Sequence, residues 1–333
     1  MKSIKIAFIG VNENSHYRQV LSRIWEMPQF FEVVGIAFPE NEKERLPGNC
    51  AHFAQLPELT VEEIMSDPSI EAVAIETDEI YCTKYALMAA RAGKHIHMEK
   101  PGGRELADFE ELVATVKAKN LVFCVGYMYR WNPYIMELME AIKAGKLGRI
   151  TSVEAQMSRT DTVEDRNWMG QFPGGMLFFL GCHLIDLIYR IQGQPQNVIP
   201  LSRSVGTDGV KTADYGMVVL EYEHGVSFAR TVCTERGGHR RRQLVVTGTE
   251  ATWELMPLET GPESAMVTGR TIYTKVRPWG DPGEKSTSQP FDRYIDMLTN
   301  FAQCVRGEKE NPYTPDYELE VFKLLLRCCG EKI

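Results

Sequence analysis

The chain has 333 residues, of which 44% are hydrophobic and 25% are charged, and its formal net charge at pH 7 is −8. This length and composition are typical of a globular protein of about two domains. The net negative charge argues against a nucleic-acid-binding or other polyanion-binding surface. No apolar run approaches the roughly 18 residues that a membrane-spanning helix needs, and the N-terminus runs directly into a strand pattern without a signal-peptide cleavage site. We therefore expect a cytoplasmic protein without membrane contact.

The first 127 residues alternate between short apolar strands and helical segments. Strands are predicted at Ile4–Ile9, Phe31–Phe38, Ala72–Ile75, Ile96–Met98 and Leu121–Val125. Helices are predicted between them, including one capped by Asn14 or Ser15, one opened by a Thr60–Glu63 capping box, and the segments Tyr81–Ala92 and Leu106–Lys119. Strands that alternate with helices pair in parallel through right-handed crossovers, so residues 1–127 are predicted to form a doubly wound Rossmann-type sheet.

The turn after the first strand is a candidate phosphate-binding turn. Dinucleotide-binding sheets carry G-x-G-x-x-G at this place, with glycines for the tight turn and for close approach of the backbone to the pyrophosphate. Here the turn reads Gly10-Val-Asn-Glu-Asn-Ser15, with one glycine and two asparagines. Because asparagine tolerates the left-handed conformation better than most residues, we predict that Gly10, Asn12 and Asn14 contact a cofactor.

The end of the second strand indicates which dinucleotide fits. An acidic residue there normally holds the adenosine ribose of NAD, but Phe38 and Pro39 occupy the position and Glu40 is the nearest carboxylate. Glu40 favours NAD slightly, whereas Lys43 and Arg45 leave NADP open.

A Glu-Lys pair stands where the fourth strand ends. Gly93 stops the preceding helix, a short apolar strand follows, and Glu99, Lys100 and Pro101 come directly after it. Open α/β sheets bind ligands outside the carboxyl ends of their strands, so Lys100 is well placed to act on a bound substrate. The alternative is a surface ion pair that contributes little.

After about Ile150 the pattern changes to alternating strands followed by two helices. The strands are predicted at Thr151–Gln156, Gly216–Tyr222, Val226–Cys233 and Gln243–Thr247, the helices at Asp292–Arg306 and Glu318–Cys329, and a loop at Ser264–Pro290. The eight cysteines show no CxxC pair, and no His, Asp or Glu cluster has metal-ligand spacing, so we expect reduced thiols and no metal site.

A predicted helix at Leu177–Ile191 would place Phe179, His183 and Asp186 on one face. Histidine is suited to general-base chemistry near neutral pH, and Asp186 could orient it; the alternative is a packed histidine bonded to Asp186. Arg130 follows the last strand of the first half and is a candidate substrate contact. Trp168, which lies beside polar residues, is a candidate contact for a polyol.

Several motifs together resemble the Gfo/Idh/MocA oxidoreductases. These are the strand ending at Gly10, Thr77 after the third strand, and the stretches Ala92-Gly-Lys-His-Ile-His-Met-Glu-Lys-Pro, Tyr127-Met-Tyr-Arg-Trp-Asn-Pro, Gly145-Lys-Leu-Gly-Arg-Ile and Gly174-Gly-Met-Leu-Phe-Phe-Leu-Gly-Cys-His-Leu-Ile-Asp. The likeness covers nearly the whole chain, and the combined order of these motifs is specific.

The resemblance implies a Rossmann domain that binds NAD or NADP and a C-terminal α+β domain, residues 128–333, with an open, mostly antiparallel sheet. Relatives commonly use the exposed face of that sheet for subunit contacts, so a homodimer or homotetramer is expected. It also implies that Thr77, Glu99 and Lys100 contact the cofactor and that Lys100 and His183 form the catalytic proton-transfer pair. The implied reaction is hydride transfer between nicotinamide and a hydroxyl or ketone of a sugar, inositol or related polyol.

The chain departs from the family pattern at two places. Many catalytically competent relatives have aspartate four residues before the histidine, where this chain has Phe179. Thr77 is followed by Asp78 and Glu79, where relatives often have proline after the threonine, and these carboxylates would be unfavourable neighbours of a pyrophosphate, although they could bond a ribose. Two alternatives therefore stay open: a redox-assisted glycoside-cleaving enzyme with tightly bound NAD, and a non-catalytic cofactor- or sugar-binding regulator.

Overall fold

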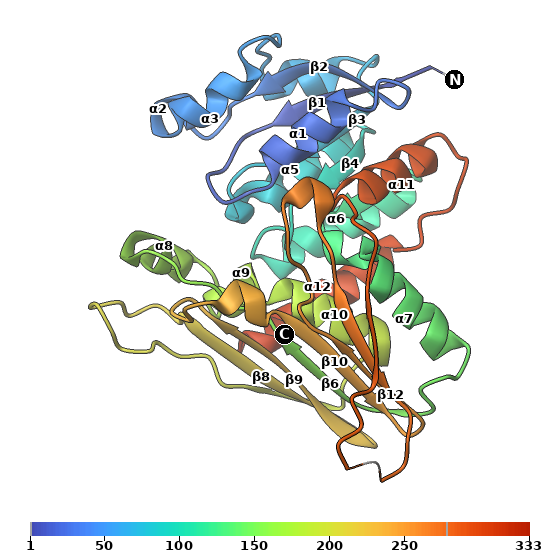
Figure 1. Cartoon of the computed structure of the whole chain (residues 1–333). Coiled ribbons are helices and arrows are strands. Elements are labelled where there is room, and N and C mark those ends of the chain that lie inside the picture. Colours follow the sequence, from blue (N-terminus) through green and yellow to red (C-terminus); the bar gives the residue numbers. More distant parts are fainter. Residues whose placement is uncertain (1, 278) are drawn as a thin grey trace. The chain divides into compact units, whose positions relative to one another are not determined.

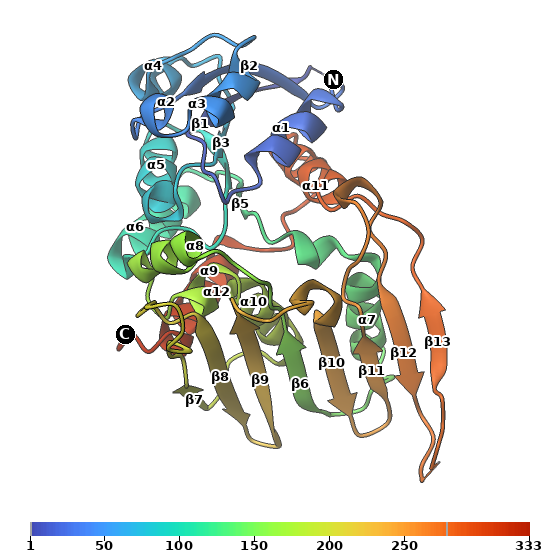
Figure 2. The same cartoon turned by 60° about the vertical axis from the view of Figure 1, so that its left-hand side comes forward.

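The structure, a computed structural model, describes residues 2–277 and 279–333. It divides into two units, which are described separately here. The first contains the residues up to Gly126 together with Tyr294–Phe322, and the second contains Tyr127–Arg293 and Lys323–Ile333. Figures 1 and 2 label the elements of both units. No helix in the described ranges is both long and apolar enough to cross a membrane.

The first unit is built on a parallel sheet in the order β2-β1-β3-β4-β5. Its strands are β1 (Ile4–Ile9), β2 (Phe31–Ala37), β3 (Ala72–Ile75), β4 (His95–Met98) and β5 (Phe123–Val125). The predicted doubly wound fold is confirmed, and the strands are nearly continuous apolar runs because both sheet faces are covered. The strand order reverses between β1 and β3, which is where such sheets bind ligands.

Helices connect these strands. They are α1 (Tyr17–Trp25), α2 (Glu42–Arg45), α3 (Pro47–Cys50), α4 (Val61–Ser66), α5 (Glu79–Arg91) and α6 (Leu106–Ala118), with a 3-10 turn at Ala51–Phe53. The predicted capping box is present, because Thr60 accepts from the Glu63 amide while the Glu63 carboxylate accepts from the Thr60 amide. The predicted cap of α1 is wrong: the N-cap residue is His16, and the Ser15 hydroxyl donates to the Asn12 carbonyl within the preceding loop.

A C-terminal segment completes the first unit. Helix α11 (Ile295–Val305) places Phe301 against the rings of Phe31 and His97, at centroid distances of 6.4 and 5.9 Å. Beyond it, the Arg306 guanidinium bonds the carbonyl oxygens of Lys2 and Gln29. The helix α12 (Pro315–Cys328) then passes from the first unit into the second after Phe322. Contacts therefore place 294–322 with the first sheet, whereas the sequence-based boundary assigns it to the second domain.

The second unit contains a wide sheet in the order β13-β12-β11-β10-β6-β9-β8-β7 (Figure 2). Its strands are β6 (Ile150–Gln156), β7 (Asn197–Pro200), β8 (Tyr215–Tyr222), β9 (Gly225–Val232), β10 (Gln243–Gly248), β11 (Thr252–Leu255), β12 (Gly269–Tyr273) and β13 (Glu284–Thr287). Within the described residues β6 and β9 pair in parallel, and the other neighbours pair antiparallel, as expected. The loop predicted at Ser264–Pro290 is wrong, because β12 and β13 lie inside it; both are short and bounded by glycine or proline.

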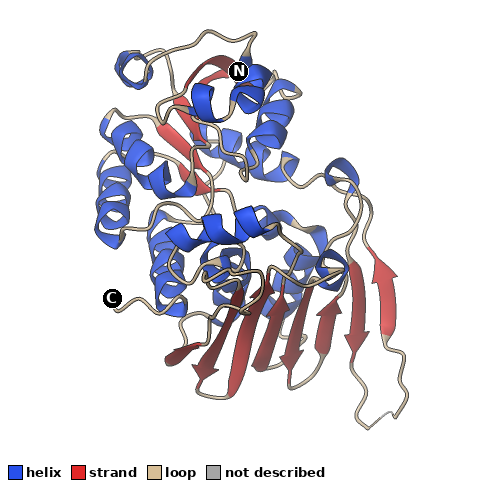
Figure 3. Ribbon diagram, turned by 90° about the vertical axis from the view of Figure 1, so that its left-hand side faces the viewer, coloured by secondary structure: helices blue, strands red, loops and turns tan. Residues whose placement is uncertain are grey.

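Helices lie against one face of this sheet (Figure 3). The helical elements of the unit are α7 (Pro133–Lys143), α8 (Val163–Trp168), α9 (Met176–Phe179) and α10 (Cys182–Gln192), with 3-10 turns at Met128–Trp131, Met169–Gln171, Gly238–Arg241 and Glu263–Ala265. Helix α9 packs on β8 so closely that a Cβ added at Gly216 would lie 2.7 Å from the Cβ of Leu177. On the other face of β8, Tyr215, Met217 and Val219 are partly exposed.

Candidate functional site

Gly10 forms the base of the candidate dinucleotide site. It lies at the carboxyl end of β1, at the switch point of the sheet, and has φ +75°. A Cβ at this position would lie 2.3 Å from Thr77 Cγ2 and 2.9 Å from Glu42 Oε1. Both the backbone conformation and the space therefore require glycine, as in the first position of the dinucleotide motif.

The loop after Gly10 is held by its own side chains. Asn12 is buried; its Oδ1 accepts the Asn14 amide at 3.0 Å, and its Nδ2 donates to Glu79 Oε2 at 2.7 Å. The Ser15 hydroxyl accepts the Tyr17 amide at 3.4 Å. Asn12 thus occupies the position of the second motif glycine, where a side chain limits the approach of a pyrophosphate.

Four buried carboxyl groups surround the switch point: Glu42, Glu76, Glu79 and Glu99. Burial raises the pKa of Glu42, although its Oε2 accepts the Glu40 amide at 2.6 Å. Burial, reinforced by the charge of Glu99, raises the pKa of Glu76 well above its ordinary value. Burial also raises the pKa of Glu79 to about 7, against the opposing effect of the Lys100 cation. Part of this cluster is therefore protonated near neutral pH.

Glu99 and Lys100 are both buried at the end of β4, so the alternative of a surface ion pair is wrong. Lys100 Nζ lies 3.7 Å from Glu99 Oε1, and His16 Nδ1 lies 3.3 Å from both carboxylate oxygens of Glu99. Burial works to raise the pKa of Glu99, but the nearby His16 and Lys100 outweigh it, and the pKa is lowered. Glu99 is therefore an ionised carboxylate that holds both groups in place.

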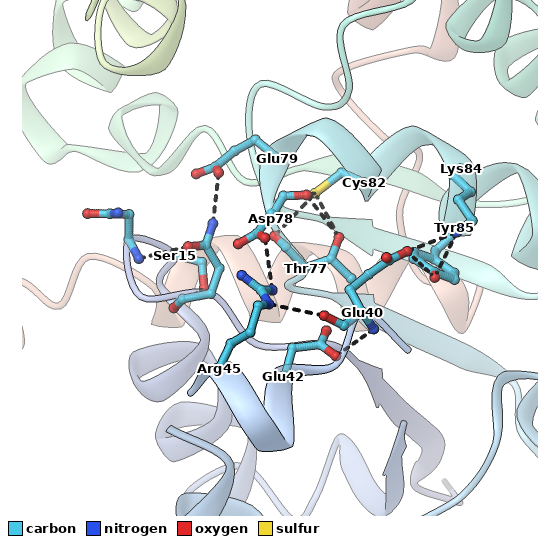
Figure 4. A network of polar contacts seen from close by, with 12 residues as sticks. Ser15, Glu40, Glu42, Arg45, Thr77, Asp78, Glu79, Cys82, Lys84 and Tyr85 are labelled. Atoms are coloured by element: carbon cyan, nitrogen blue, oxygen red, sulfur yellow. Dashed lines mark hydrogen bonds and ion pairs between the residues drawn. The ribbon is translucent and has the colours of Figure 1, made fainter. Parts of the chain in front are cut away.

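Glu40 is engaged away from Gly10. Its carboxylate binds Lys84 Nζ at 2.8 Å and the Tyr85 hydroxyl, while Arg45 Nη2 binds Asp78 Oδ2 at 2.9 Å (Figure 4). Beside Glu40 is a cavity of about 420 Å³. Its lining includes Phe38, Pro39, Leu59, Thr60, Tyr85 and Met88.

Glu42, which sequence reasoning missed, is the carboxylate that limits the space at Gly10, 2.9 Å from where a Cβ would lie. Its sequence position, several residues beyond the end of β2, gives no signal for this. This placement depends on the fold-back at Asn41, whose φ is +58°.

In the second unit, the His183 ring packs against two tyrosine rings. The centroids of Tyr127 and Tyr129 are 5.8 and 5.0 Å from the imidazole, both edge-on. The single helix predicted at Leu177–Ile191 is wrong, because the chain forms α9 and α10 with a break at Leu180 and Gly181. His183 and Asp186 share α10, whereas Phe179 belongs to α9.

Asp186 is the ion-pair partner of Arg130. Arg130 Nε lies 3.0 Å from both carboxylate oxygens and Nη2 lies 2.7 Å from Oδ1, with both residues buried. The Tyr127 ring lies under the guanidinium at 4.6 Å, and Arg190 Nη1 binds the Arg130 carbonyl at 3.0 Å. This pair fixes the 3-10 turn that carries Arg130 against α10, the helix that carries His183.

Phe179 and Trp168 belong to an aromatic cluster. The ring of Phe179 is 5.1 Å from Trp168 and 6.0 Å from Phe172, and the Arg159 guanidinium lies 5.2 Å above it. Phe179 is buried, whereas Trp168 is partly exposed. The position at which the resemblance leads us to expect an acid therefore contributes to apolar packing and offers no group that can carry a proton.

Sequence reasoning also missed a buried polar cluster around Tyr129. Its hydroxyl binds Glu259, Arg242 Nη1 at 3.0 Å and Arg293 Nη2 at 3.2 Å. Arg242 and Arg293 also bind Glu259, whose pKa is lowered because the two cations outweigh its burial. The three partners are more than 100 positions away from Tyr129, so no local spacing signals the cluster. It fixes the tyrosine ring that lies edge-on to His183.

Among the residues that the structure describes, no group of three or more His, Cys, Asp or Glu side chains could hold a metal ion. The cofactor that the fold implies is a dinucleotide. Gly10 fits it, because a Cβ would fill the space at the switch point, and Lys100 supplies a cation nearby in the sheet. Asn12 and Glu79 are the exception to this fit.

A parallel sheet with a glycine turn at its switch point is the arrangement of a dinucleotide-binding Rossmann domain, and the second unit contains an open, mostly antiparallel sheet. Residues 4–127 match the family described as "Oxidoreductase family, NAD-binding Rossmann fold", and residues 135–254 match "GFO/IDH/MocA C-terminal domain". The chain belongs to the Gfo/Idh/MocA family.

Named relatives share moderate identity with the chain. A trans-1,2-dihydrobenzene-1,2-diol dehydrogenase from Bos taurus is 26% identical over 275 residues, covering 80% of this chain and 78% of the relative. The scyllo-inositol 2-dehydrogenase (NADP(+)) IolW from Bacillus subtilis is 26% identical over 164 residues, covering 49% and 46%. The chain spans about half the length of several curated relatives that it matches.

A solved structure shows the same fold. The WlbA dehydrogenase from Bordetella pertussis, in complex with NADH and UDP-GlcNAcA, superposes with a TM-score of 0.77 at 18% identity, covering 99% of this chain and 98% of that one.

Proposed function

We propose that this protein is an NAD(P)-dependent dehydrogenase that transfers a hydride between nicotinamide and a hydroxyl or ketone of a sugar, inositol or related polyol. The observation that carries the proposal is the buried Glu99–Lys100 pair, held by His16 at the carboxyl end of β4. A buried lysine needs a reason, because burial of an ammonium group is costly unless it is paired or functional. The relatives named for a diol and an inositol support the substrate class.

In this proposal Lys100 and His183 carry the proton chemistry. A nicotinamide dinucleotide, when bound, would supply the hydride-transfer chemistry. His183, whose ring is oriented by Tyr127 and Tyr129, accepts the proton of the substrate hydroxyl. The Lys100 ammonium stabilises the developing alkoxide, and the Glu99 carboxylate keeps it in place. Arg130, Asp186 and Trp168 then contribute to the substrate side, the first two as a fixed ion pair.

NAD is the proposed cofactor, held by the Gly10 turn, Asn12, Asn14 and Thr77. Glu40 and Glu42 follow β2, and the cavity beside Glu40 offers Phe38 and Tyr85 as an apolar surface for the adenine. Carboxylates at this place favour a ribose with free hydroxyls and repel a 2′-phosphate. Lys84 and Arg45 are already paired with Glu40 and Asp78, which weakens the case for NADP.

We also propose a homodimer or homotetramer formed through the partly exposed face of the second sheet. Tyr215, Met217 and Val219 give that face an apolar strip along β8. Size-exclusion chromatography with light scattering tests this, and a monomer at micromolar concentration would rule it out.

A second candidate function is a cofactor- or sugar-binding regulator without turnover. The observation that favours it is the burial of Phe179 in an aromatic cluster, where competent relatives are expected to have an acid. Binding of NAD and of a sugar without nicotinamide reduction, across a broad substrate panel, would favour this function over the dehydrogenase.

The central test of the dehydrogenase is Lys100→Met, which keeps most of the side-chain length but removes the cation. We expect turnover to fall by about 100-fold or more, as for removal of other proton-transfer or charge-stabilising groups, and NAD affinity to fall far less. Nicotinamide absorbance measures turnover and calorimetry measures affinity. Lys119→Met, at an exposed position of the same unit, is the control. Unchanged turnover in Lys100→Met would remove Lys100 from the mechanism.

A further inference from the structure

The Asn12–Glu79 hydrogen bond closes the place where a pyrophosphate approaches the sheet. Asn12 stands at the second glycine position of the motif, and its side chain is buried rather than turned to solvent. Its Oδ1 accepts a hydrogen bond from the Asn14 amide, and its Nδ2 donates a hydrogen bond to Glu79. Backbone amides of this loop normally donate to the phosphates of a dinucleotide. In this chain the Asn14 amide is already used.

Glu79 is the first residue of α5, and its side chain extends to the loop after Gly10. Its Oε2 accepts from Asn12, while its Oε1, also buried, has no hydrogen-bond partner among the described residues. Charged and titratable groups face it from each neighbouring element: Glu76 after β3, Glu99 and Lys100 at the end of β4, and Cys82 one turn along α5. His16, on the loop before α1, acts on this group through Glu99. A pyrophosphate would add negative charge to a region that already holds three carboxyl groups and one lysine.

We propose that Glu79 is a proton-dependent latch on the cofactor site: dinucleotide binding breaks the Asn12–Glu79 hydrogen bond and transfers one proton from solvent to the Glu79 carboxylate. This inference rests on the proposed function, since it requires that a dinucleotide binds. The protonated carboxyl becomes a hydrogen-bond donor, and the release of Asn12 frees the Asn14 amide for a phosphate oxygen. Glu79 acts by positioning and by charge, and it takes no part in hydride transfer.

The pH range of the latch follows from its surroundings. Because burial raises the pKa of Glu79 to about 7, the carboxyl is protonated in the free protein below that pH and ionised above it. Below about pH 7 binding takes up little proton, and the NAD dissociation constant stays nearly constant. Above it, each pH unit raises the dissociation constant by up to about tenfold, because one proton must be supplied with each dinucleotide.

The experiment is calorimetric titration of NAD into the full-length protein at pH 6, 7, 8 and 9. At pH 8 it is repeated in two buffers of different ionisation enthalpy, so that the number of protons taken up is measured directly. We expect proton uptake approaching one for the wild type. For Glu79→Gln, which keeps an acceptor for Asn12 but cannot ionise, we expect uptake near zero and a flat pH profile. Glu105→Gln removes an exposed charge from the same unit and should behave as the wild type.

Asn12→Gly separates the two parts of the latch. It frees the Asn14 amide but leaves Glu79 ionisable, so NAD should bind more tightly at pH 6 and still lose affinity above pH 7. Equal proton uptake in the wild type and Glu79→Gln would overturn the latch while leaving the dehydrogenase proposal intact. If Glu79→Gln binds NAD but the wild type binds none even at pH 6, where Glu79 is protonated, the latch is overturned, because a protonated Glu79 should admit the dinucleotide. If neither binds, both proposals fail.

Discussion

His97 is a buried histidine for which the proposed chemistry has no use. It lies on β4, and neither ring nitrogen has a hydrogen-bond partner within the described part of the chain. Its ring packs edge-on against Phe301. Burial lowers its pKa to about 4, and the charge of Glu99 does not offset this. The residue therefore stays neutral and places polar atoms in the core at a cost in stability.

The stability of the protein should consequently depend on pH through His97. His97 protonates near pH 6.5 in the unfolded state but only near pH 4 in the folded state. The free energy of unfolding is therefore at its full value above pH 6.5 and decreases as the pH falls, because the unfolded state takes up the proton first. The loss amounts to about 3 kcal/mol at pH 4. We expect His97→Leu to narrow the gap between stabilities at pH 7 and pH 4 by this amount. Urea unfolding at both pH values measures it, with exposed His224→Gln as the control, and an unchanged gap would contradict the assignment.

The Arg130–Asp186 pair makes a different prediction at the same scale. Removing one member leaves the other charge buried without compensation, which costs about 3–5 kcal/mol. We expect Asp186→Asn and Arg130→Met each to destabilise the protein by this amount. The double variant should lose less stability than the two single variants lose together, because it leaves no buried charge without its partner. Denaturant unfolding of the four proteins measures the coupling, and additive effects would mean that the pair is not energetically linked.

At the scale of elements, the break between α9 and α10 depends on Gly181. Its φ is −66°, so backbone freedom is not the reason for glycine. A Cβ would lie 2.5 Å from the Leu177 carbonyl oxygen and 2.6 Å from Leu177 Cδ1. The close approach lets the chain turn from one helix into the next and sets the start of the helix that carries His183.

Gly181→Ala should therefore destabilise the protein by about 1–3 kcal/mol, as overpacking does, although alanine is the better helix former. Gly48→Ala is the matched control, because Gly48 lies in α3 with nothing within 4 Å of an added Cβ. That variant should be neutral or slightly stabilising. Thermal unfolding compares the two, and equal melting temperatures for both variants would argue against the contact.

Elements whose signals are local were predictable. β1 and β3 have the predicted bounds, and the Thr60 capping box is in place, because apolar runs and cap residues act over a few positions. β12 and β13 were missed, because strands this short are recognised mainly by their backbone pairing with a neighbouring strand, and backbone pairing gives no pattern in the sequence.

In the site, the positions of Glu99 and Lys100 could be predicted because both residues come directly after one strand. The placement of Glu42 beside Gly10 and the hydrogen bond of Tyr129 to Glu259 depend on chain folding at long range.

At the scale of the whole chain, the first sheet is covered partly by residues that come near the end of the sequence. Phe301 is fully buried and packs on β2 and β4 through Phe31 and His97. Phe301→Ala should lower the free energy of unfolding by about 3–5 kcal/mol. Hydrogen exchange should become faster in β2 and β4 but change less in β8 of the second unit. Uniform acceleration in both units would show that they unfold together.

The position of α11 also constrains how the protein is made. The strands that Phe301 covers are synthesised first, but their cover is available only after the chain has been translated through most of the second unit, Tyr127–Arg293. At about 5–20 residues per second, the nascent first sheet waits on the order of 10–30 s with an apolar face open. During that interval the growing chain is a substrate for chaperones and is prone to aggregate, so slow translation or low temperature should affect its yield more than its final stability.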